Sequence, residues 1–331
     1  YRDLAELSKS GEQLSAGAKV YTVCMKKAIA LFHLGSAPLE QGMAILGAHI
    51  DSPRLDIKQN PLYEDTELVY LDTHYYGGVK KYQWVTIPLA IHGVVAKKDG
   101  SVVEINIGDH EDDPIFCITD LLIHLAAEQQ EKKGSKLING EDLDLLIGSM
   151  PLADTEKDAV KANIIQILAD QYGIDEEDFL SAELEIVPAG RARECGIDRS
   201  MIMAYGHDDR VCAYASLLAM LESETRDKTI CCLLMDKEEI GSVGATGTQS
   251  RFFENAVAEL MNAAGQYNEL ALRRCLCASK MLSSDVSAGY DPLYASVYEK
   301  KNAAYLGKGI VFNKYTGSRG KSGSNDANAE Y

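Results

Sequence analysis

Apolar and polar residues follow two different patterns along this chain, one at its two ends and another in its middle. The first residues contain a terminal helix at 4–14 and two strand-like segments, the second of which ends within residues 47–56. From residue 200 onward, short apolar runs alternate with helix-length amphipathic segments. This alternation predicts a mostly parallel sheet covered by helices. Its strands are expected at 200–205, 229–235, 278–284 and 308–313, and its helices at 209–222 and 252–264.

The middle of the chain has a texture of its own. Short β-like runs at 85–95 and 101–107 are broken by glycines, and residues 115–133 place apolar side chains at helical spacing. A chain of 331 residues also exceeds what one hydrophobic core usually organises. We therefore expect an α/β domain formed by residues 1–57 and 200–331, interrupted by a smaller, β-rich α+β domain at 58–199.

Charge and composition exclude several classes of function. The net charge of -17 disfavours nucleic acid and anionic membrane surfaces as partners. No apolar stretch approaches the ~20 residues of a membrane helix. Eight scattered cysteines without a Cys-x-x-Cys pair favour reduced thiols in the cytoplasm. The opening Tyr1-Arg2-Asp3 and the abrupt ending suggest that sequence is missing at both ends.

Four residues with metal-ligand side chains each follow a strand-like apolar run. In an open α/β sheet, ligands gather beyond the carboxyl ends of the strands. One imidazole and three carboxylates at that edge suit hard or borderline divalent cations. The pattern indicates a metal-dependent hydrolase, with ligands His49, Asp208, Glu239 and Asp285.

Two of these ligands have neighbours that change their interpretation. Asp51 shares a strand face with His49, so it can accept the second ring N–H of a metal-bound His49. The alternative is an ordinary polar pair at a strand end. Asp208 precedes a second aspartate at a predicted helix start, where one acid suffices as a cap and the other can bridge two cations.

The pair Glu238-Glu239 is the catalytic candidate. Neighbouring residues that leave a strand point in divergent directions, so Glu239 can bind a cation while Glu238 takes a proton from water and returns it to the leaving amine. Adjacent acids are also common on surfaces, and Asp285 could simply begin a turn.

A basic stretch near the end of the chain reverses the general charge. Lys314 is one of four cations between Gly307 and Asn325, a segment without acidic residues. It could attract an anionic substrate group, or it could be a solvated loop. The Gly317–Ser322 segment is no phosphate loop, because Tyr315 stands where a Walker motif requires Gly.

Four separated motifs, in this order, resemble the aspartyl aminopeptidase family. They are GAHIDSPR at 47–54, HDDR at 207–210, DKEEIGS at 236–242 and SDV at 284–286. The family includes vacuolar aminopeptidases and bacterial relatives among the di-zinc exopeptidases. The resemblance implies a zinc-exopeptidase α/β fold, an inserted dimerisation domain and a tetrahedral dodecamer. It also implies removal of single N-terminal residues from peptides, with acidic and neutral residues both represented among relatives.

The resemblance also implies roles for the four ligands. His49 and Asp285 would hold one zinc ion (Zn2+), Glu239 would hold the other, and Asp208 would bridge them. Co2+ or Mn2+ could occupy nitrogen and oxygen ligands of this kind. The same resemblance makes Glu238 the general acid/base and Asp51 the residue that orients His49.

Three further features follow from the resemblance. Residues 123–125 resemble the segment with which the family places a His in a neighbouring subunit's active site, so His124 is expected to contact substrate there. Lys314 is expected to recognise an acidic side chain. The family's final metal-binding His has no counterpart after His207, and we expect the chain to be incomplete at its C-terminus.

Two other functions use the same residues. A di-metal carboxypeptidase or deacylase would need the same ligand set. A catalytically impaired assembly subunit would explain an incomplete second metal site.

Overall fold

The computed structural model describes residues 1–224 and 227–312, which divide into two compact units. Unit 1 consists of Tyr1–Asp51 with the described residues from Gly206 on, and unit 2 of Ser52–Tyr205. The expected domain limits, after residue 57 and before residue 200, stay a prediction.

Unit 1 is built on a six-stranded mixed sheet in the order β1-β2-β3-β14-β4-β15. Its apolar strand β14 lies inside the sheet, antiparallel to β3 and parallel to β4. β15 pairs in parallel with β4, and β1 with β2, so three of the five pairings are parallel. The strands are β1 (Arg2–Asp3), β2 (Lys19–Cys24), β3 (Ala28–His33), β4 (Ala44–His49), β14 (Ile230–Met235) and β15 (Lys280–Ser283).

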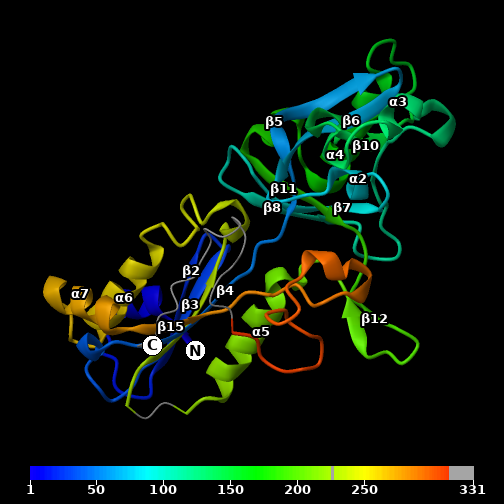
Figure 1. Ribbon diagram of the computed structural model, residues 1–331. Coiled ribbons are helices and arrows are strands. Elements are labelled where there is room, and N and C mark those ends of the chain that lie inside the picture. Colours follow the sequence, from blue (N-terminus) through cyan, green and yellow to red (C-terminus); the bar gives the residue numbers. More distant parts are fainter. Residues whose placement is uncertain (225–226, 313–331) are drawn as a thin grey trace. The chain divides into compact units, whose positions relative to one another are not determined.

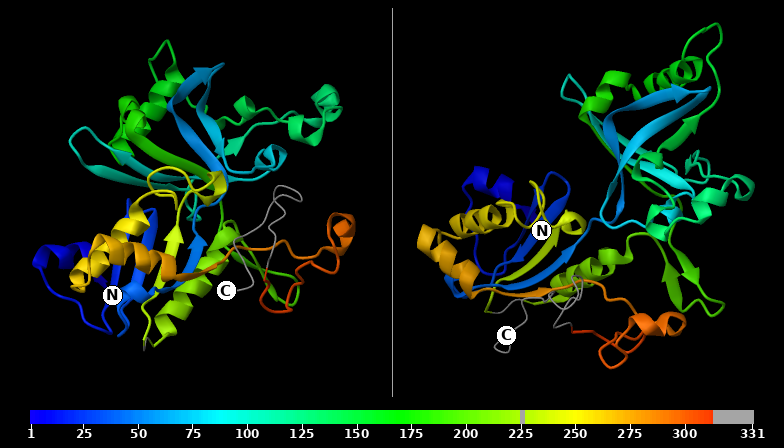
Figure 2. Two further views of the ribbon diagram at one scale, coloured as in Figure 1. Left: turned by 60° about the vertical axis from the view of Figure 1, so that its left-hand side comes forward. Right: turned by 45° about the horizontal axis from the view of Figure 1, so that its top comes forward.

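Helices cover both faces of this sheet, as Figures 1 and 2 show. One face packs against α1 (Leu4–Ser10), α6 (Phe252–Ala263) and α7 (Glu269–Ala278), and the other against α5 (His207–Glu222). Among the described residues, no helix is both long and apolar enough to cross a bilayer. Short 3₁₀ helices lie at η1 (Leu39–Gln41), η6 (Glu238–Ile240) and η7 (Pro292–Val297).

Unit 2 contains an antiparallel sheet of seven strands in the order β8-β7-β11-β5-β6-β10-β9. Apolar residues from these strands and from α4 (Ala159–Tyr172) form its separate core. The strands are β5 (Arg54–Asp65), β6 (Leu68–Tyr76), β7 (Leu89–Ala96), β8 (Val102–Ile107), β9 (Cys117–Ile118), β10 (Leu145–Gly148) and β11 (Ala182–Pro188). Shorter elements are α2 (Lys81–Trp84), α3 (Ala127–Gln130), η2 (Ile123–Leu125), η3 (Gly134–Lys136), η4 (Gly140–Asp142), η5 (Glu176–Ser181) and the hairpin β12 (Arg193–Cys195) with β13 (Met201–Met203).

The long helix predicted at 115–133 was wrong. Its first residues are recruited into the sheet, where Phe116 bridges to Leu89 and β9 pairs with β10. The carboxylate of Asp120 then accepts the Leu121 backbone N–H at 2.8 Å, a local bond that competes with helix formation. Only the short elements η2 and α3 remain of the predicted helix.

Two predicted strands also differ from the structure. Residues 201–203 form β13, but this strand pairs only with β12 in a two-stranded sheet of its own. Its three side chains are exposed, so it could not serve as a core strand of unit 1. Residues 308–312 form no strand, and residue 313 lies outside the described residues. The elements predicted at 209–222, 229–235, 252–264 and 278–284 are present as α5, β14, α6 and β15, whereas α7 was not predicted.

Candidate metal centre

The carboxyl ends of three neighbouring strands converge at one edge of the sheet of unit 1. β4 ends at His49, which lies beside Met235, the last residue of β14, in parallel register. Glu238 and Glu239 begin η6 just beyond β14, and Asp285 follows β15. The expected convergence of these segments is therefore seen within one unit.

Three carboxylates lie close to the His49 imidazole. Its Nε2 atom lies 3.0 Å from Asp208 Oδ1, 3.7 Å from Glu238 Oε2 and 3.9 Å from Asp285 Oδ1. The imidazole is 5% exposed, whereas these three carboxylate side chains are 48–55% exposed. The centre thus has a buried imidazole at its base and acids open to solvent above it.

Asp51 joins the imidazole to the two glutamates. His49 Nδ1 lies 3.0 Å from the Asp51 backbone carbonyl and 3.3 Å from its carboxylate. The same buried carboxylate accepts the backbone N–H groups of Glu238 at 3.1 Å and Glu239 at 3.2 Å. One side chain therefore contacts the second ring nitrogen and also fixes the turn that carries both glutamates.

Two overlapping groups of side chains could hold a metal ion. In each group the ligand atoms lie within 4.8 Å of one another: His49 with Asp208 and Glu239, and His49 with Asp209 and Asp285. Since one ring nitrogen binds one ion, His49 can complete only one of the groups. The donors are nitrogen and oxygen, a set that suits zinc.

Asp209 is the residue that sequence reasoning underestimated. The sequence predicts it only as the second acid of a helix start, yet it is fully buried and neither carboxylate oxygen has a hydrogen bond. A buried carboxylate without donors is costly unless a cation compensates it. Its position beside Asp208 was the only signal in the sequence.

The expected helix cap is not formed by these aspartates. The residue at the N-cap of α5 is Gly206, and no side chain caps the helix there. Asp208 and Asp209 have non-helical backbone angles inside the first turn, and the peptide bond between them is cis. Asp208 Oδ1 lies 3.0 Å from His49 Nε2.

Burial, followed by repulsion among the acids, raises the pKa values of the carboxylates at this centre. Burial and the charges of Asp208 and Glu238 raise the pKa of Glu239 to about 7. Burial and the charge of Asp208 also raise the pKa of Asp285. Burial lowers the pKa of His49, but the hydrogen bond to Asp51 and the surrounding acids outweigh it and raise this pKa to about 9. A divalent cation would relieve this crowding, so the residues present fit a metal site.

Two predicted site residues, His124 and Lys314, remain to be placed. His124 belongs to η2 of unit 2 and is exposed, together with its apolar neighbours in the segment Leu121–Leu125. Lys314 lies outside the described residues.

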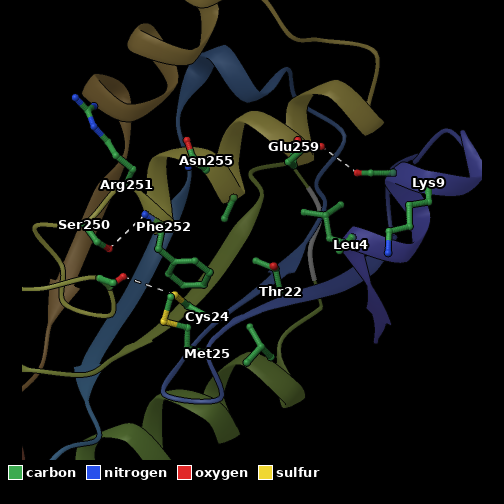
Figure 3. Close-up of a pocket in the computed structure, with 15 residues that line it drawn as sticks. Leu4, Lys9, Thr22, Cys24, Met25, Ser250, Arg251, Phe252, Asn255 and Glu259 are labelled. Carbon is green, nitrogen blue, oxygen red and sulfur yellow. Dashed lines mark hydrogen bonds between the residues drawn. The ribbon is translucent and has the colours of Figure 1, made fainter. Parts of the chain in front are cut away.

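A separate pocket of about 780 Å³ lies between α1, β2 and α6 of unit 1 (Figure 3). Leu4, Met25 and Phe252 contribute apolar surface to it. Ala245 and Ser250, from the loop after the glutamates, form part of its wall, and the Cys24 thiol donates to the Ala245 carbonyl at 3.7 Å. None of the acids around His49 lines this pocket.

Comparison with known proteins assigns the chain to a family. Residues 1–330 match the family model described as aminopeptidase I zinc metalloprotease (M18). A probable M18 family aminopeptidase 1 from Clostridium acetobutylicum is 62% identical over the whole chain, which spans 71% of that relative. A second relative with this description, from Thermotoga maritima, is 49% identical over 94% of the chain and 68% of its own length.

Solved structures agree with this assignment. The crystal structure of aminopeptidase I from Clostridium acetobutylicum matches with a TM-score of 0.89 and 59% identity, covering 99% of this chain and 74% of that one. The M18 aminopeptidase structure from Thermotoga maritima matches with a TM-score of 0.91 and 45% identity over the same shares. The match of the family model, the relatives and the fold together show that the chain belongs to the M18 family of zinc metalloaminopeptidases.

Proposed function

We propose that this chain is a two-zinc aminopeptidase whose active site is the centre around His49, and that it removes single residues from the free N-termini of peptides. The observation that carries the proposal is the pair of overlapping ligand groups that share His49. We assign His49 and Asp285 to one ion, Glu239 to the other, and Asp208 to the position between them. Zinc bound there would polarise the scissile carbonyl and acidify water.

Glu238 is the proposed general acid/base. Its carboxylate is 48% exposed and lies 3.7 Å from His49 Nε2, so it faces the ligand cluster and remains accessible to substrate. Burial raises the pKa of Glu238, which helps it to hold a proton and then release it to the leaving amine. Asp51 supports this role because it holds the Glu238 backbone N–H and the His49 imidazole at once.

The acidic surroundings favour a free amine on the substrate. Asp208, Glu238 and Asp285 present half-exposed carboxylates in the same small region. The free amine of a substrate would bind beside the metal ions and these acids, a contact that an acylated N-terminus cannot make. A peptide with a blocked N-terminus should therefore be a poor substrate.

Self-association is the proposed role of the segment around His124. Leu121, Leu122, Ile123 and Leu125 are 52–68% exposed in succession, an unusual run of apolar side chains on a surface. We propose that another copy of the chain covers this segment and receives His124 as a substrate contact. Assembly to dimers and a tetrahedral dodecamer fits the description of a distant yeast relative as a dodecamer.

Substrate preference and compartment are proposed from the sequence. Lys314 would recognise acidic N-terminal side chains, and a panel of peptides that differ only in their first residue tests this preference. All eight cysteines are free, which suits a reducing cytoplasm.

Replacement of the proposed base is the decisive experiment. Glu238→Gln keeps the shape of the side chain and removes its proton transfer, so kcat on a free aminoacyl-p-nitroanilide should fall by about 10²–10⁴-fold. Zinc content should stay at the wild-type value. Equal release of product by the variant and the wild-type protein would refute the assigned mechanism.

A further inference from the structure

The loop after β14 carries both glutamates and is closed on itself. We call residues 237–250 the glutamate loop. It leaves the sheet at Lys237, which has a positive φ of 70°, and turns at once into η6. The Ser242 backbone N–H returns to the Lys237 carbonyl at 2.6 Å, and Gln249 N–H donates to the Ser242 carbonyl at 3.1 Å. These bonds fold the loop but do not attach its far end to the sheet.

A buried side-chain hydrogen bond makes that attachment. The Thr246 hydroxyl donates to Asp236 Oδ2 at 2.5 Å, and both residues are 5% exposed. Asp236 is the first residue after β14, immediately before the loop begins. The bond therefore joins the residue before the glutamate loop to one ten positions further along the chain. Because the acceptor is a buried carboxylate, loss of the hydroxyl would leave one of its oxygens short of a donor.

The packing of the loop limits how far it could adjust. A Cβ atom on Gly247 would lie 2.2 Å from the Ser242 carbonyl oxygen, so the chain beside Thr246 passes in direct contact with the opposite side of the loop. The Gln249 amide also donates to the Gly241 carbonyl at 2.8 Å. Thr246 thus reaches Asp236 from a rigid turn rather than from a free strand of chain.

The glutamates are held from two sides as a result. On the His49 side, Asp51 accepts the N–H groups of Glu238 and Glu239. On the sheet side, the Asp236–Thr246 bond fixes the residue from which the turn departs. Removal of either contact takes away one of the two hydrogen-bonded supports beside the glutamates.

We propose that Thr246 is a positioning residue for the hydrolytic reaction. Acting through Asp236, its hydroxyl sets the direction in which Glu238 and Glu239 leave the sheet, and therefore their alignment with His49. The proposal rests on the roles assigned above to Glu238 and Glu239. Residues that orient the direct ligands of a metal typically change metal affinity or activity by about 10–100-fold when they are replaced.

The test compares two substitutions at Thr246 with one elsewhere. Thr246→Val keeps the shape of the side chain and deletes the hydroxyl, and Thr246→Ser restores it. Thr229→Val is the matched control, because the Thr229 hydroxyl is also buried and accepts the Gly35 N–H at 3.0 Å, but just before the opposite end of β14. Each zinc-loaded variant is assayed for kcat and KM, and each metal-free variant is titrated with zinc alone.

We expect Thr246→Val to lower kcat by about tenfold or more, with KM within about twofold of wild type. The affinity of the weaker of the two zinc sites should also fall by about tenfold or more. Thr246→Ser should recover most of both losses. Thr229→Val should lower the melting temperature while kcat and zinc affinity stay at wild-type values. If Thr246→Val folds and matches Thr229→Val in every assay, the bond is only structural and the proposal is overturned.

Failure of the assigned mechanism would look different. An active Glu238→Gln protein would remove the premise, whatever the result at Thr246. An inactive Glu238→Gln protein beside a fully active Thr246→Val protein would overturn the positioning role alone. If Thr246→Val does not fold, Thr246→Ala takes its place as the variant without the hydroxyl. Reduced kcat and zinc affinity that Thr246→Ser recovers support the positioning role, and wild-type kcat and zinc affinity in Thr246→Ala overturn it.

Discussion

Replacement of Asp51 by Asn should separate geometry from charge at the centre. The Asp51 carboxylate accepts two backbone N–H groups and lies 3.3 Å from His49 Nδ1. An Asn amide keeps one acceptor oxygen but points an NH₂ group at one of these donors. The change also removes the negative charge that strengthens the imidazole as a ligand.

The magnitude follows from these contacts. A residue that supports a metal-binding His typically contributes about 10–100-fold to metal affinity, or about 1.4–2.8 kcal/mol. Each hydrogen bond to a charged group contributes about 1.5–3 kcal/mol to stability, and one of the two backbone bonds is lost. We therefore expect Asp51→Asn to bind zinc about 10–100-fold more weakly and to unfold at a lower temperature.

Zinc affinity is measured by competition with a chromophoric chelator, and activity with a free aminoacyl-p-nitroanilide. Asp178→Asn is the matched control, because Asp178 is similarly buried in unit 2 and its carboxylate accepts the Asp175 N–H at 3.0 Å. It should lose stability and keep its zinc affinity. Wild-type zinc affinity and kcat in Asp51→Asn would show that the carboxylate does not support His49.

Further predictions concern protons and assembly. In the metal-free protein the pKa of His49 is raised to about 9 and that of Glu239 to about 7, so both groups must release protons to bind zinc. Zinc affinity should therefore rise as pH increases from 6 to 9, by about tenfold per pH unit for each proton released. Calorimetry in buffers of different ionisation enthalpy should detect the released protons. A zinc affinity that does not change with pH would contradict this prediction. Leu122→Glu places a charge in the exposed apolar segment and should shift the protein to smaller species in sedimentation. His124→Ala should keep the assembly and lower kcat. An unchanged size distribution in Leu122→Glu would rule out this interface.

The convergence of the candidate ligands could be predicted because each follows a strong local signal. His49 is the last residue of β4, and Glu239 lies four residues beyond the end of β14. The parallel register of these strands brings the two ends together. Asp209 could not be assigned in this way. Its burial and its place near Asp285 depend on the irregular start of α5, which no local pattern encodes.

The insert shows where local patterns fail. Residues 115–133 have helical apolar spacing, but pairing with distant strands captures residues 116–118 and leaves Leu121 and Leu122 exposed. Tertiary pairing thus overrides the period of a short segment. The Asp236–Thr246 bond was equally invisible, since a threonine ten residues downstream has many possible partners.

The two points at which the chain enters and leaves unit 2 are tied to each other. The Tyr205 hydroxyl donates to the Pro53 carbonyl at 2.8 Å, so both ends of this 154-residue excursion meet at one place. An inserted domain whose two ends lie close together can be lengthened, shortened or exchanged during evolution with little disturbance to the host sheet. Because it begins one residue after Asp51 and ends before Gly206, every candidate metal ligand lies outside the exchanged segment and stays in the host sheet's unit.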